Sequence, residues 1–356
     1  MIEFRHVSLS LGAFSLRDVS LQIHEGDYYF IIGPSGAGKT VILESIAGLH
    51  LPDSGSVLIG GEDASSVPPE RRRVTLVYQD YSLFPHMTVE QNIGFGLRMQ
   101  RMDKGLIRER VDALLSQFGI AHLRDRYPGT MSGGEQQRVA IARALAVEPE
   151  ILLLDEPFAA LDPVTRESLM SDLQQIHQER RLTIVQVTHA REETLRLATR
   201  LAVIIDGSLV QEDVTGVVFE APHSTAVARF VGMENILHGT VETNVEGLAT
   251  IRVGNRTIEA VTDIVPGSTV DVVFRAADVT LSRTDCTDVS ARNQFEGGIT
   301  AVVPMGGPLT EVRLDVGFPV TALVTSRSAE EGELRPGMRV TISVKASAVH
   351  VIPDGA

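Results

Sequence analysis

The stretch that most constrains this 356-residue chain is a glycine-rich turn, Gly33–Thr40, with the sequence GPSGAGKT. It fits the pattern G-x-x-x-x-G-K-S/T, whose backbone N–H groups surround nucleotide phosphates. The preceding residues, Tyr28–Ile32, form an apolar run typical of a buried strand, and Val41–Ala47 have the pattern of a helix that ends near Gly48. Because the motif requires strand, turn and helix in this order, we predict a nucleotide-binding α/β fold.

The chemistry of this turn gives each of its residues a role. Glycines let the backbone approach the phosphates, and a helix N-terminus turns its N–H groups toward anionic oxygens. Lys39 is expected to reach the β- and γ-phosphates, and the Thr40 hydroxyl to hold Mg²⁺. The predicted cofactor-binding residues of the turn are Gly33, Pro34, Ser35, Gly36, Ala37, Gly38, Lys39 and Thr40.

Composition limits the partners and the compartment. The chain is 43% apolar, and its length suits two or three domains. With 32 basic and 46 acidic residues, the net charge of −14 argues against a nucleic-acid partner held by phosphate contacts. The one cysteine, Cys286, allows no internal disulfide framework and suits a reducing cytoplasm. Neither a signal-peptide region nor a run of about 20 apolar residues is present, so we expect any membrane role to be peripheral.

Three further strands end in polar residues. Val74–Gln79 ends in a glutamine, Ile151–Glu156 ends in two carboxylates, and Leu182–His189 ends in a histidine. The carboxyl ends of parallel strands face the ligand in α/β folds. We therefore predict that Asp155 is a Mg²⁺ ligand and that Glu156 polarises the attacking water.

Two other regions complete the predicted nucleotide domain. Met131–Arg138 opens a long helix with Ser-Gly-Gly, which is either a second anion-binding helix start or an ordinary N-cap and turn. Residues 1–30 alternate apolar and polar side chains, which predicts an antiparallel flap beside the nucleotide. Phe14 in this flap is a candidate for stacking on the base, with simple core packing as the alternative.

This set of motifs, in this order, resembles the nucleotide-binding subunit of an ABC transporter over about residues 1–232. The resemblance implies an ATP-hydrolysing P-loop NTPase with a RecA-like core, a helical subdomain and an antiparallel β flap. It makes Gln79, Glu156 and His189 catalytic, and Thr40, Gln79 and Asp155 metal ligands. Beyond the turn, the cofactor-binding residues that it implies are Phe14, Ser132, Gly133, Gly134, Gln136, Asp155 and Asp162.

The same resemblance implies a homodimer with two subunits head to tail. Ser132 and Gly134 of one subunit would then face the γ-phosphate held by Lys39 of the other. Two positions depart from the usual pattern: Met131 replaces a leucine and Ala160 replaces a serine.

Asp80–Gly96 resembles the corresponding stretch of import ATPases, where membrane permease subunits dock. We expect exposed Tyr81, Phe84 and Met87 to form that socket, with local packing as the alternative. The resemblance also implies a peripheral location at the cytoplasmic face of the inner membrane. A periplasmic or extracellular binding protein would act through the permease.

After Phe230–Gly232, short alternating strands with Gly, Asn and Pro turns replace the helical pattern. An internal repeat is present: Asn235–Val241 resembles Asn293–Ile299, and Arg275–Val279 resembles Lys345–Val349. The offsets are 58 and 70 residues, so the second copy is twelve residues longer in its middle. We predict an all-β, OB-like region made of two small barrels.

The predicted domain boundaries follow from these patterns. The ATPase domain is 1–232, and the two barrel segments are 233–286 and 287–356. A linker around Ser282–Val289 is expected to join the barrels.

The two copies differ in chemistry. The first carries Asp278, whereas the second carries Ser347 and Ala348. With Arg292 and Lys345, the second copy offers donors and no acidic residue inside its motifs. Such a set suits a fully deprotonated oxyanion better than hydrogen phosphate, which needs an acceptor for its own proton. The alternative is solvated basic side chains on a barrel surface.

Ser290–Asn293 followed by Lys345–Val349 resembles the Mop-type module of molybdate- and tungstate-binding proteins. Behind an ABC ATPase, it is similar to the regulatory domain of molybdate/tungstate importers, which implies inhibition by accumulated oxyanion. The oxyanion residues that it suggests are Ser290, Ala291, Arg292, Asn293, Thr325, Ser326, Lys345, Ala346 and Ser347.

Three functions are therefore weighed. The first is an ATPase subunit for molybdate or tungstate import. The second is an import ATPase for sulfate, sugar, polyamine or iron, with a structural or regulator-docking C-terminal domain. The third is a soluble ABC ATPase acting on nucleic acid or ribosomes, which the acidic composition and the import-like Asp80–Gly96 stretch disfavour.

Overall fold

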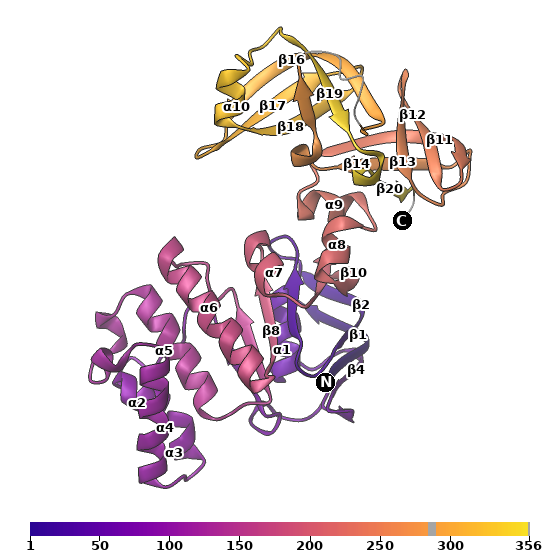
Figure 1. The fold of residues 1–356 in the computed structure, drawn as a ribbon. Coiled ribbons are helices and arrows are strands. Elements are labelled where there is room, and N and C mark those ends of the chain that lie inside the picture. The colour runs from indigo at the N-terminus through magenta and orange to yellow at the C-terminus, as the bar shows by residue number, and fades with distance from the viewer. Residues whose placement is uncertain (284–289, 355–356) are drawn as a thin grey trace. The chain divides into compact units, whose positions relative to one another are not determined.

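The computed structural model describes residues 1–283 and 290–354. These residues form two compact units, Met1–Gly216 and Val217–Ala356, which are described separately (Figure 1). The first unit contains the nucleotide motifs, and the second contains the sequence repeat.

The first unit is built around a six-stranded sheet with the order β10-β9-β3-β8-β7-β6. All its strands are parallel except β10, which pairs antiparallel with β9. Their bounds are β3 (Tyr28–Ile32), β6 (Val74–Val77), β7 (Ile151–Asp155), β8 (Thr183–Thr188), β9 (Arg200–Ile205) and β10 (Ser208–Val214). Every residue of β3, β7 and β8 is buried, as expected for central strands covered on both faces.

A second, antiparallel sheet of four strands accompanies the parallel one, in the order β2-β1-β4-β5. Its strands are β1 (Ile2–Leu11), β2 (Phe14–Ile23), β4 (Ser54–Ile59) and β5 (Glu62–Asp63). One apolar cluster joins its inward side chains, such as Phe4 and Val19, to helix α1 (Lys39–Ala47) and to the parallel sheet. The predicted antiparallel flap is thus confirmed as part of the core.

Helices fill the connections between the parallel strands (Figure 1). Between β6 and β7 lie α2 (Val89–Ile93), α3 (Phe95–Met99), α4 (Lys104–Gln117) and α5 (Gly133–Ala146). Helix α6 (Pro163–Arg180) joins β7 to β8, and α7 (Arg191–Leu197) joins β8 to β9. This arrangement is the predicted ABC ATPase fold of RecA-like core, helical subdomain and β flap.

The second unit contains two five-stranded antiparallel sheets, with the orders β13-β12-β11-β14-β20 and β15-β19-β16-β17-β18. The first repeat supplies β11 (Asn235–Val245), β12 (Leu248–Val253), β13 (Arg256–Val261), β14 (Thr269–Phe274) and β15 (Thr280–Ser282). The second supplies β16 (Asn293–Pro304), β17 (Leu309–Asp315), β18 (Pro319–Thr325), β19 (Arg339–Val344) and β20 (His350–Pro353). The internal repeat in the sequence is therefore a repeat in the structure.

The two repeats exchange their last strands. Strand β15 pairs with β19 of the second repeat, and β20 pairs with β14 of the first. One apolar cluster also runs through both sheets, from Leu237 to Val351. Two barrels joined only by a linker, as the sequence suggested, are thus corrected to two sheets that share strands and a core. Of the expected linker Ser282–Val289, Ser282 belongs to β15, and residues 284–289 lie outside the described residues.

Helices α8 (Thr215–Glu220) and α9 (Thr225–Val231) precede the first repeat. The Arg275 guanidinium donates to the Phe219 carbonyl at 2.7 Å, and the His350 ring bonds to the Pro222 carbonyl at 3.0 Å. These contacts explain why the division between the units falls at 216/217, whereas the sequence analysis placed the domain boundary at 232.

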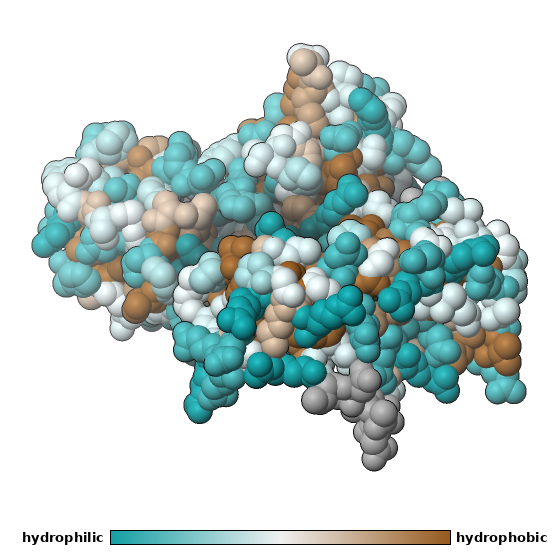
Figure 2. Space-filling model, turned by 90° about the horizontal axis from the view of Figure 1, so that it is seen from above, coloured by the Kyte–Doolittle hydropathy of each residue, from teal (hydrophilic) through white to brown (hydrophobic). Residues whose placement is uncertain are grey.

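No helix among the described residues is long and apolar enough to cross a membrane. On the face shown in Figure 2, hydrophobic residues are scattered among hydrophilic ones.

Candidate functional site

The sheet order brings the predicted nucleotide residues to one edge. Strands β3, β8, β7 and β6 are consecutive neighbours and parallel. Their carboxyl ends therefore carry, side by side, the glycine-rich turn, His189, the Asp155–Glu156 pair and Gln79. Ligands bind at this edge in doubly wound folds.

The glycine-rich turn is held by close backbone contacts. A Cβ on Gly33 would lie 2.0 Å from the Ile204 carbonyl oxygen, so only glycine fits there. The Lys39 ammonium donates to the carbonyls of Gly33 and Pro34, each at 2.9 Å. Burial lowers the pKa of Lys39 from its usual value, although the nearby Glu156 and Asp155 carboxylates oppose the shift. The buried cation is thus aimed into the turn, where a phosphate would sit.

Thr40 and Asp155 form a hydroxyl–carboxylate pair. The Thr40 hydroxyl donates to Asp155 Oδ2 at 3.0 Å. Burial raises the pKa of Asp155, which is only 8% exposed. These are oxygen ligands of the kind that Mg²⁺ prefers. Among the described residues no group of three or more His, Cys, Asp or Glu side chains could hold a metal ion.

Glu156 and His189 face each other. His189 Nδ1 lies 3.1 Å from Glu156 Oε1. Glu156 has a φ of +45°, a conformation rarely adopted by residues other than glycine, and such backbone strain concentrates at functional sites. The two predicted catalytic side chains are therefore within hydrogen-bond reach.

A cavity of about 410 Å³ lies beside the glycine-rich turn. The flap contributes Leu11 and Phe14 to its wall, and Glu156 also lines it. The Phe14 ring packs so closely on Gly38 that a Cβ there would lie 2.3 Å from it. Phe14 is half-buried at this wall, so both of its predicted roles, stacking and packing, fit its position. Exposed Gln79 is not among the described residues that line the cavity.

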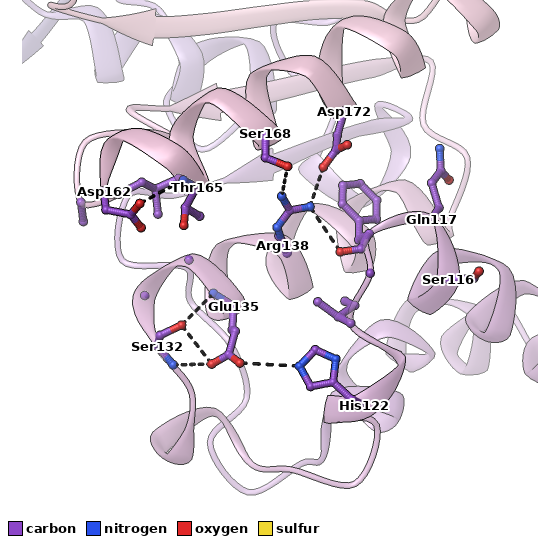
Figure 3. Close-up of a pocket in the computed structure, with 17 residues that line it drawn as sticks. Ser116, Gln117, His122, Ser132, Glu135, Arg138, Asp162, Thr165, Ser168 and Asp172 are labelled. Carbon is purple, nitrogen blue, oxygen red and sulfur yellow. Dashed lines mark hydrogen bonds and ion pairs between the residues drawn. The ribbon is translucent and has the colours of Figure 1, made fainter.

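The second glycine-rich helix start lines a separate pocket of about 730 Å³ (Figure 3). Ser132 caps α5: its hydroxyl accepts from the Glu135 N–H at 3.3 Å, and the Glu135 carboxylate accepts from the Ser132 N–H at 2.7 Å. These bonds to Ser132 lower the pKa of Glu135. The N-cap interpretation of Ser-Gly-Gly is therefore correct locally, and the pocket leaves Ser132, Gly133 and Gly134 at its wall.

Asp162 and Gln136 already make local bonds. Asp162 Oδ1 caps α6 by accepting from the N–H groups of Val164 and Thr165 at 3.0 and 3.1 Å. Asp162 also lines the pocket of Figure 3. Gln136 Nε2 donates to the Met131 carbonyl at 3.1 Å. Asp162 thus lines the same pocket as Ser132, and both Asp162 and Gln136 help to shape the loops that they belong to.

Arg138 in this pocket was not singled out from the sequence. Figure 3 shows its guanidinium reaching Ser168 and Asp172 of α6, and it also donates to the Phe118 carbonyl at 3.2 Å. No local motif marks this residue, because its partners come from distant parts of the chain.

The expected permease socket is packed rather than fully exposed. Tyr81, Phe84 and Met87 are each half-buried. The Phe84 ring lies 4.5 Å from that of Phe95, and buried Asn92 donates to the Phe84 carbonyl at 3.1 Å. The prediction of three exposed side chains is therefore wrong. The local packing that was the alternative accounts for much of their burial.

The two oxyanion motifs meet in the second unit. Strands β16 and β19 are antiparallel, with Asn293 opposite Val344. Arg292, just before β16, and Lys345, just after β19, therefore lie at the same end of this strand pair. Buried Asn293 bonds to both the N–H and the carbonyl of Glu259 on β13, at 2.7 and 2.8 Å. Exposed Lys345 begins the short 3₁₀ turn Ala346–Ala348, which also packs on β13.

This cluster is not made of donors alone. The Arg292 guanidinium donates to the Glu259 carboxylate at 3.1 Å. Glu259 comes from the first repeat, so the motifs themselves gave no signal of it. The expectation of a donor-only pocket is corrected by this tertiary contact. Ser290, Ala291 and Ser347 lie in the same two segments, and Ser290 and Ser347 are exposed.

Thr325 and Ser326 have other partners. Thr325 caps α10 (Ser326–Glu331) by accepting from the Ser328 N–H at 3.0 Å. The Ser326 hydroxyl lies 3.1 Å from that of Thr310. Strand β18, which ends at Thr325, packs against the 3₁₀ turn of the first repeat, whereas Lys345 begins the turn that packs on β13. The structure therefore does not group these two residues with Arg292 and Lys345.

The fold and these loops define an ATP-binding cassette. A family described as ABC transporter matches residues 16–159, and a TOBE domain matches residues 289–351. The chain belongs to the ABC transporter family, as an ATP-hydrolysing subunit of an importer.

Several relatives resemble the chain over most of its length. It is 40% identical to the molybdate/tungstate import ATP-binding protein WtpC of Pyrococcus horikoshii, covering 99% of this chain and 100% of the relative. It is 38% identical to the spermidine/putrescine import ATP-binding protein PotA of Oleidesulfovibrio alaskensis, with 92% and 91% covered. It is 37% identical to the sulfate/thiosulfate import ATP-binding protein CysA of Thermosynechococcus vestitus, with 96% and 95% covered.

The first unit also resembles a solved structure. The dimeric ATP-binding cassette MJ0796 bound to ADP and Pi is 32% identical and superposes with a TM-score of 0.56. The match covers 60% of this chain and 99% of that one.

Proposed function

We propose that this subunit energises the import of molybdate or tungstate. The observation that carries the proposal is the meeting of Arg292 and Lys345 beside one strand end of the second repeat. A guanidinium and an ammonium there can both donate to a tetrahedral oxyanion. A guanidinium has five N–H donors, so its bond to Glu259 leaves donors for such a ligand. The similarity to WtpC over 99% of the chain supports the same substrate class.

The second candidate is import of another solute. PotA and CysA resemble the chain at 38% and 37% identity, close to the 40% of WtpC. The names of these relatives specify spermidine/putrescine and sulfate/thiosulfate as the imported solutes. In that case the second unit would serve a structural or regulator-docking role.

The nucleotide chemistry follows from the site residues. Lys39 and the backbone N–H groups of the glycine-rich turn hold the phosphates of ATP. Glu156 would polarise the attacking water, and His189, whose Nδ1 lies 3.1 Å from Glu156 Oε1, would orient Glu156. Gln79, two residues after the end of β6, lies at the same edge of the sheet.

Thr40 and Asp155 fit a Mg²⁺ ion bound with ATP, with Gln79 as a further oxygen ligand. Such an ion would neutralise the charge of the phosphates. Opening the Thr40–Asp155 hydrogen bond would release both oxygens for it.

Hydrolysis requires two subunits in this proposal. Ser132 and Gly134 line a pocket of their own, so in one subunit they are not part of the cavity beside Lys39. A head-to-tail homodimer would bring them to the γ-phosphate held by the other subunit. A terminal phosphate then receives donors from two helix starts.

The helical subdomain is the proposed docking surface for the membrane permease. Beside α2 lies a cavity of about 680 Å³ whose walls include Ile107, Val111, Arg98 and Arg124. Glu90 and Gln91 of the Asp80–Gly96 stretch also line it, and Arg124 is paired with Glu90, so the apolar side chains are the part of the wall that suits a helix of the permease. The subunit would then lie at the cytoplasmic face of the membrane, and a binding protein outside would deliver the oxyanion to the permease.

Molybdate or tungstate would also regulate the ATPase. When the oxyanion accumulates in the cytoplasm, it binds at the Arg292–Lys345 cluster, between the C-terminal units of two subunits. Binding there holds the ATPase halves apart, and import stops.

Turnover of a Glu156→Gln variant tests the ATPase mechanism. Hydrolysis should be abolished while ATP binding is kept, because water polarisation is lost and the phosphate contacts remain. Lys39→Ala should instead weaken ATP binding itself. Normal hydrolysis in the first variant or unchanged nucleotide affinity in the second would contradict the assigned roles.

Calorimetric titration of the full chain tests the substrate class. Molybdate and tungstate should bind tightly, and sulfate and phosphate weakly or not at all. No binding of either metal oxyanion would favour import of another solute and leave the ATPase assignment intact.

A further inference from the structure

A buried glutamate lies behind the nucleotide site without contacting it. Glu193, on α7, is only 4% exposed. Burial raises the pKa of its carboxyl group, and the nearby Arg166 guanidinium lowers it again. A carboxylate is seldom buried unless hydrogen bonds or an opposite charge stabilise it.

The partners of Glu193 lie on the strand that carries His189. Glu193 Oε2 accepts from the Thr188 hydroxyl at 2.7 Å and from Gln186 Nε2 at 3.3 Å. Gln186 Oε1 in turn accepts from the Tyr28 hydroxyl at 2.8 Å. All of these side chains are buried, so the carboxylate is anchored to the centre of the parallel sheet.

The bond to Thr188 fixes the turn around His189. A threonine hydroxyl has one hydrogen, and here that hydrogen points to Glu193. The oxygen is therefore oriented to accept from the Ala190 N–H, which it does at 3.0 Å. Thr188 and Ala190 are the residues on either side of His189, so the bond from Thr188 to Glu193 links the carboxylate to the turn that carries His189.

The same glutamate lies near the loop that precedes α6. Arg166 Nη2 donates to the Leu161 carbonyl at 3.1 Å. Its Nε is buried without a hydrogen-bond partner among the described residues. Arg166 bonds to the loop that contains Leu161, and Glu193 bonds to the strand end that precedes His189. The electrostatic attraction between Arg166 and Glu193 therefore connects these two loops.

We propose that Glu193 is a positioning residue for ATP hydrolysis, which acts through the Thr188 hydroxyl to hold His189 opposite Glu156. The proposal rests on the roles proposed above for His189 and Glu156. It predicts that loss of the Glu193–Thr188 bond lowers kcat without changing ATP affinity, since the phosphate-binding turn is untouched.

The test is steady-state ATPase activity and ATP affinity of the full chain in four single variants. Thr188→Val removes the hydroxyl with little change of shape, and Glu193→Leu removes the acceptor while keeping about the same volume. Both should lower kcat at least about 10-fold with ATP affinity unchanged within about 2-fold. Thr188→Ser restores the hydroxyl and should restore kcat. Glu192→Ala is the matched control, because Glu192 is the exposed neighbour on the same helix and its loss should leave kcat unchanged.

A double-mutant cycle separates positioning from simple stabilisation. If Glu193 acts through His189, then adding Thr188→Val to His189→Ala should cause no further loss of kcat. Losses that multiply, or variants with wild-type kcat, would overturn the proposal. If His189→Ala alone kept full turnover, the proposed role of His189 would be wrong. Turnover lost in His189→Ala but kept in Thr188→Val and Glu193→Leu would overturn only the role of Glu193.

Discussion

The two repeats of the second unit share one fold and differ in chemistry. Each repeat has four strands in the same order, followed by a 3₁₀ turn. The last strand of each repeat, β15 or β20, pairs with the sheet of the other repeat. Position by position, Arg292 corresponds to Glu234, Lys345 to Arg275 and Ala348 to Asp278. The comparison shows that the fold repeats because its apolar pattern repeats, while a binding function needs only a few different side chains.

The first repeat binds its own chain at the corresponding positions. The Glu234 carboxylate accepts from the Ala276 N–H at 2.8 Å, and Arg275 donates to the Phe219 carbonyl. A carboxylate thus occupies the region where, in the second repeat, Arg292 and Lys345 are proposed to hold an oxyanion. A duplicated fold can therefore keep one copy for structure and the other for a ligand.

The largest expected effect concerns what the repeats share. Asn235 and Asn293, both 3% exposed, each bond to the N–H and carbonyl of an edge strand of the other repeat, at Thr321 and Glu259. Either change to alanine leaves two backbone groups unpaired and should destabilise the unit by about 2–4 kcal/mol. Thermal unfolding would measure it, with exposed Asn255→Ala as the control. Clearly unequal losses for Asn235 and Asn293 would contradict the structural equivalence of the repeats.

The next largest effect concerns the oxyanion-binding residues, in which the two repeats differ. Lys345→Ala should weaken molybdate binding about 10- to 100-fold, the loss of one charged hydrogen bond of about 1.5–3 kcal/mol. Arg275→Ala, the change at the corresponding position of the first repeat, should leave molybdate affinity unchanged. Calorimetry on the full chain would distinguish the repeats, and a larger loss in Arg275→Ala would reverse the assignment.

A smaller effect concerns α10, which has no counterpart in the first repeat. Thr325→Ala removes the N-cap of this helix and should cost about 1 kcal/mol of stability. Because Thr325 bonds within α10, molybdate affinity should not change. Loss of affinity in this variant would instead return Thr325 to the oxyanion site.

The smallest effect is a difference in pH dependence. His350 of the second repeat corresponds to Thr280 of the first. Burial lowers the pKa of His350 in the folded state, so below the unfolded pKa of about 6.5 the unfolded chain binds the extra proton first. Stability should fall as pH drops through this window. His350→Thr should reduce the fall in unfolding temperature between pH 7.5 and 5.5, and an identical pH profile would argue against a titrating His350.

Most of the ATPase fold could be predicted from the sequence. The Gly33–Thr40 turn, the Asp155–Glu156 pair and His189 each follow a buried strand, and all are marked by local pattern. Because the strands that precede these residues are neighbours in one parallel sheet, the residues meet at one edge of that sheet. The socket prediction failed because the burial of Phe84 depends on Asn92 and Phe95, and sequence spacing does not reveal that packing.

In the C-terminal unit, too, some features follow from the sequence and others from tertiary contacts. The sequence alone determined that there are two repeats built of short strands and which copy carries Arg292 and Lys345, because apolar alternation and residue type are local properties. Only the tertiary structure decided that β15 and β20 change places, that Glu259 reaches Arg292 and that Glu193 lies beneath His189. Strand exchange and the Arg292–Glu259 ion pair join segments that are far apart in the sequence, and the Glu193–Thr188 bond depends on burial against the parallel sheet, so no short stretch of sequence reveals them.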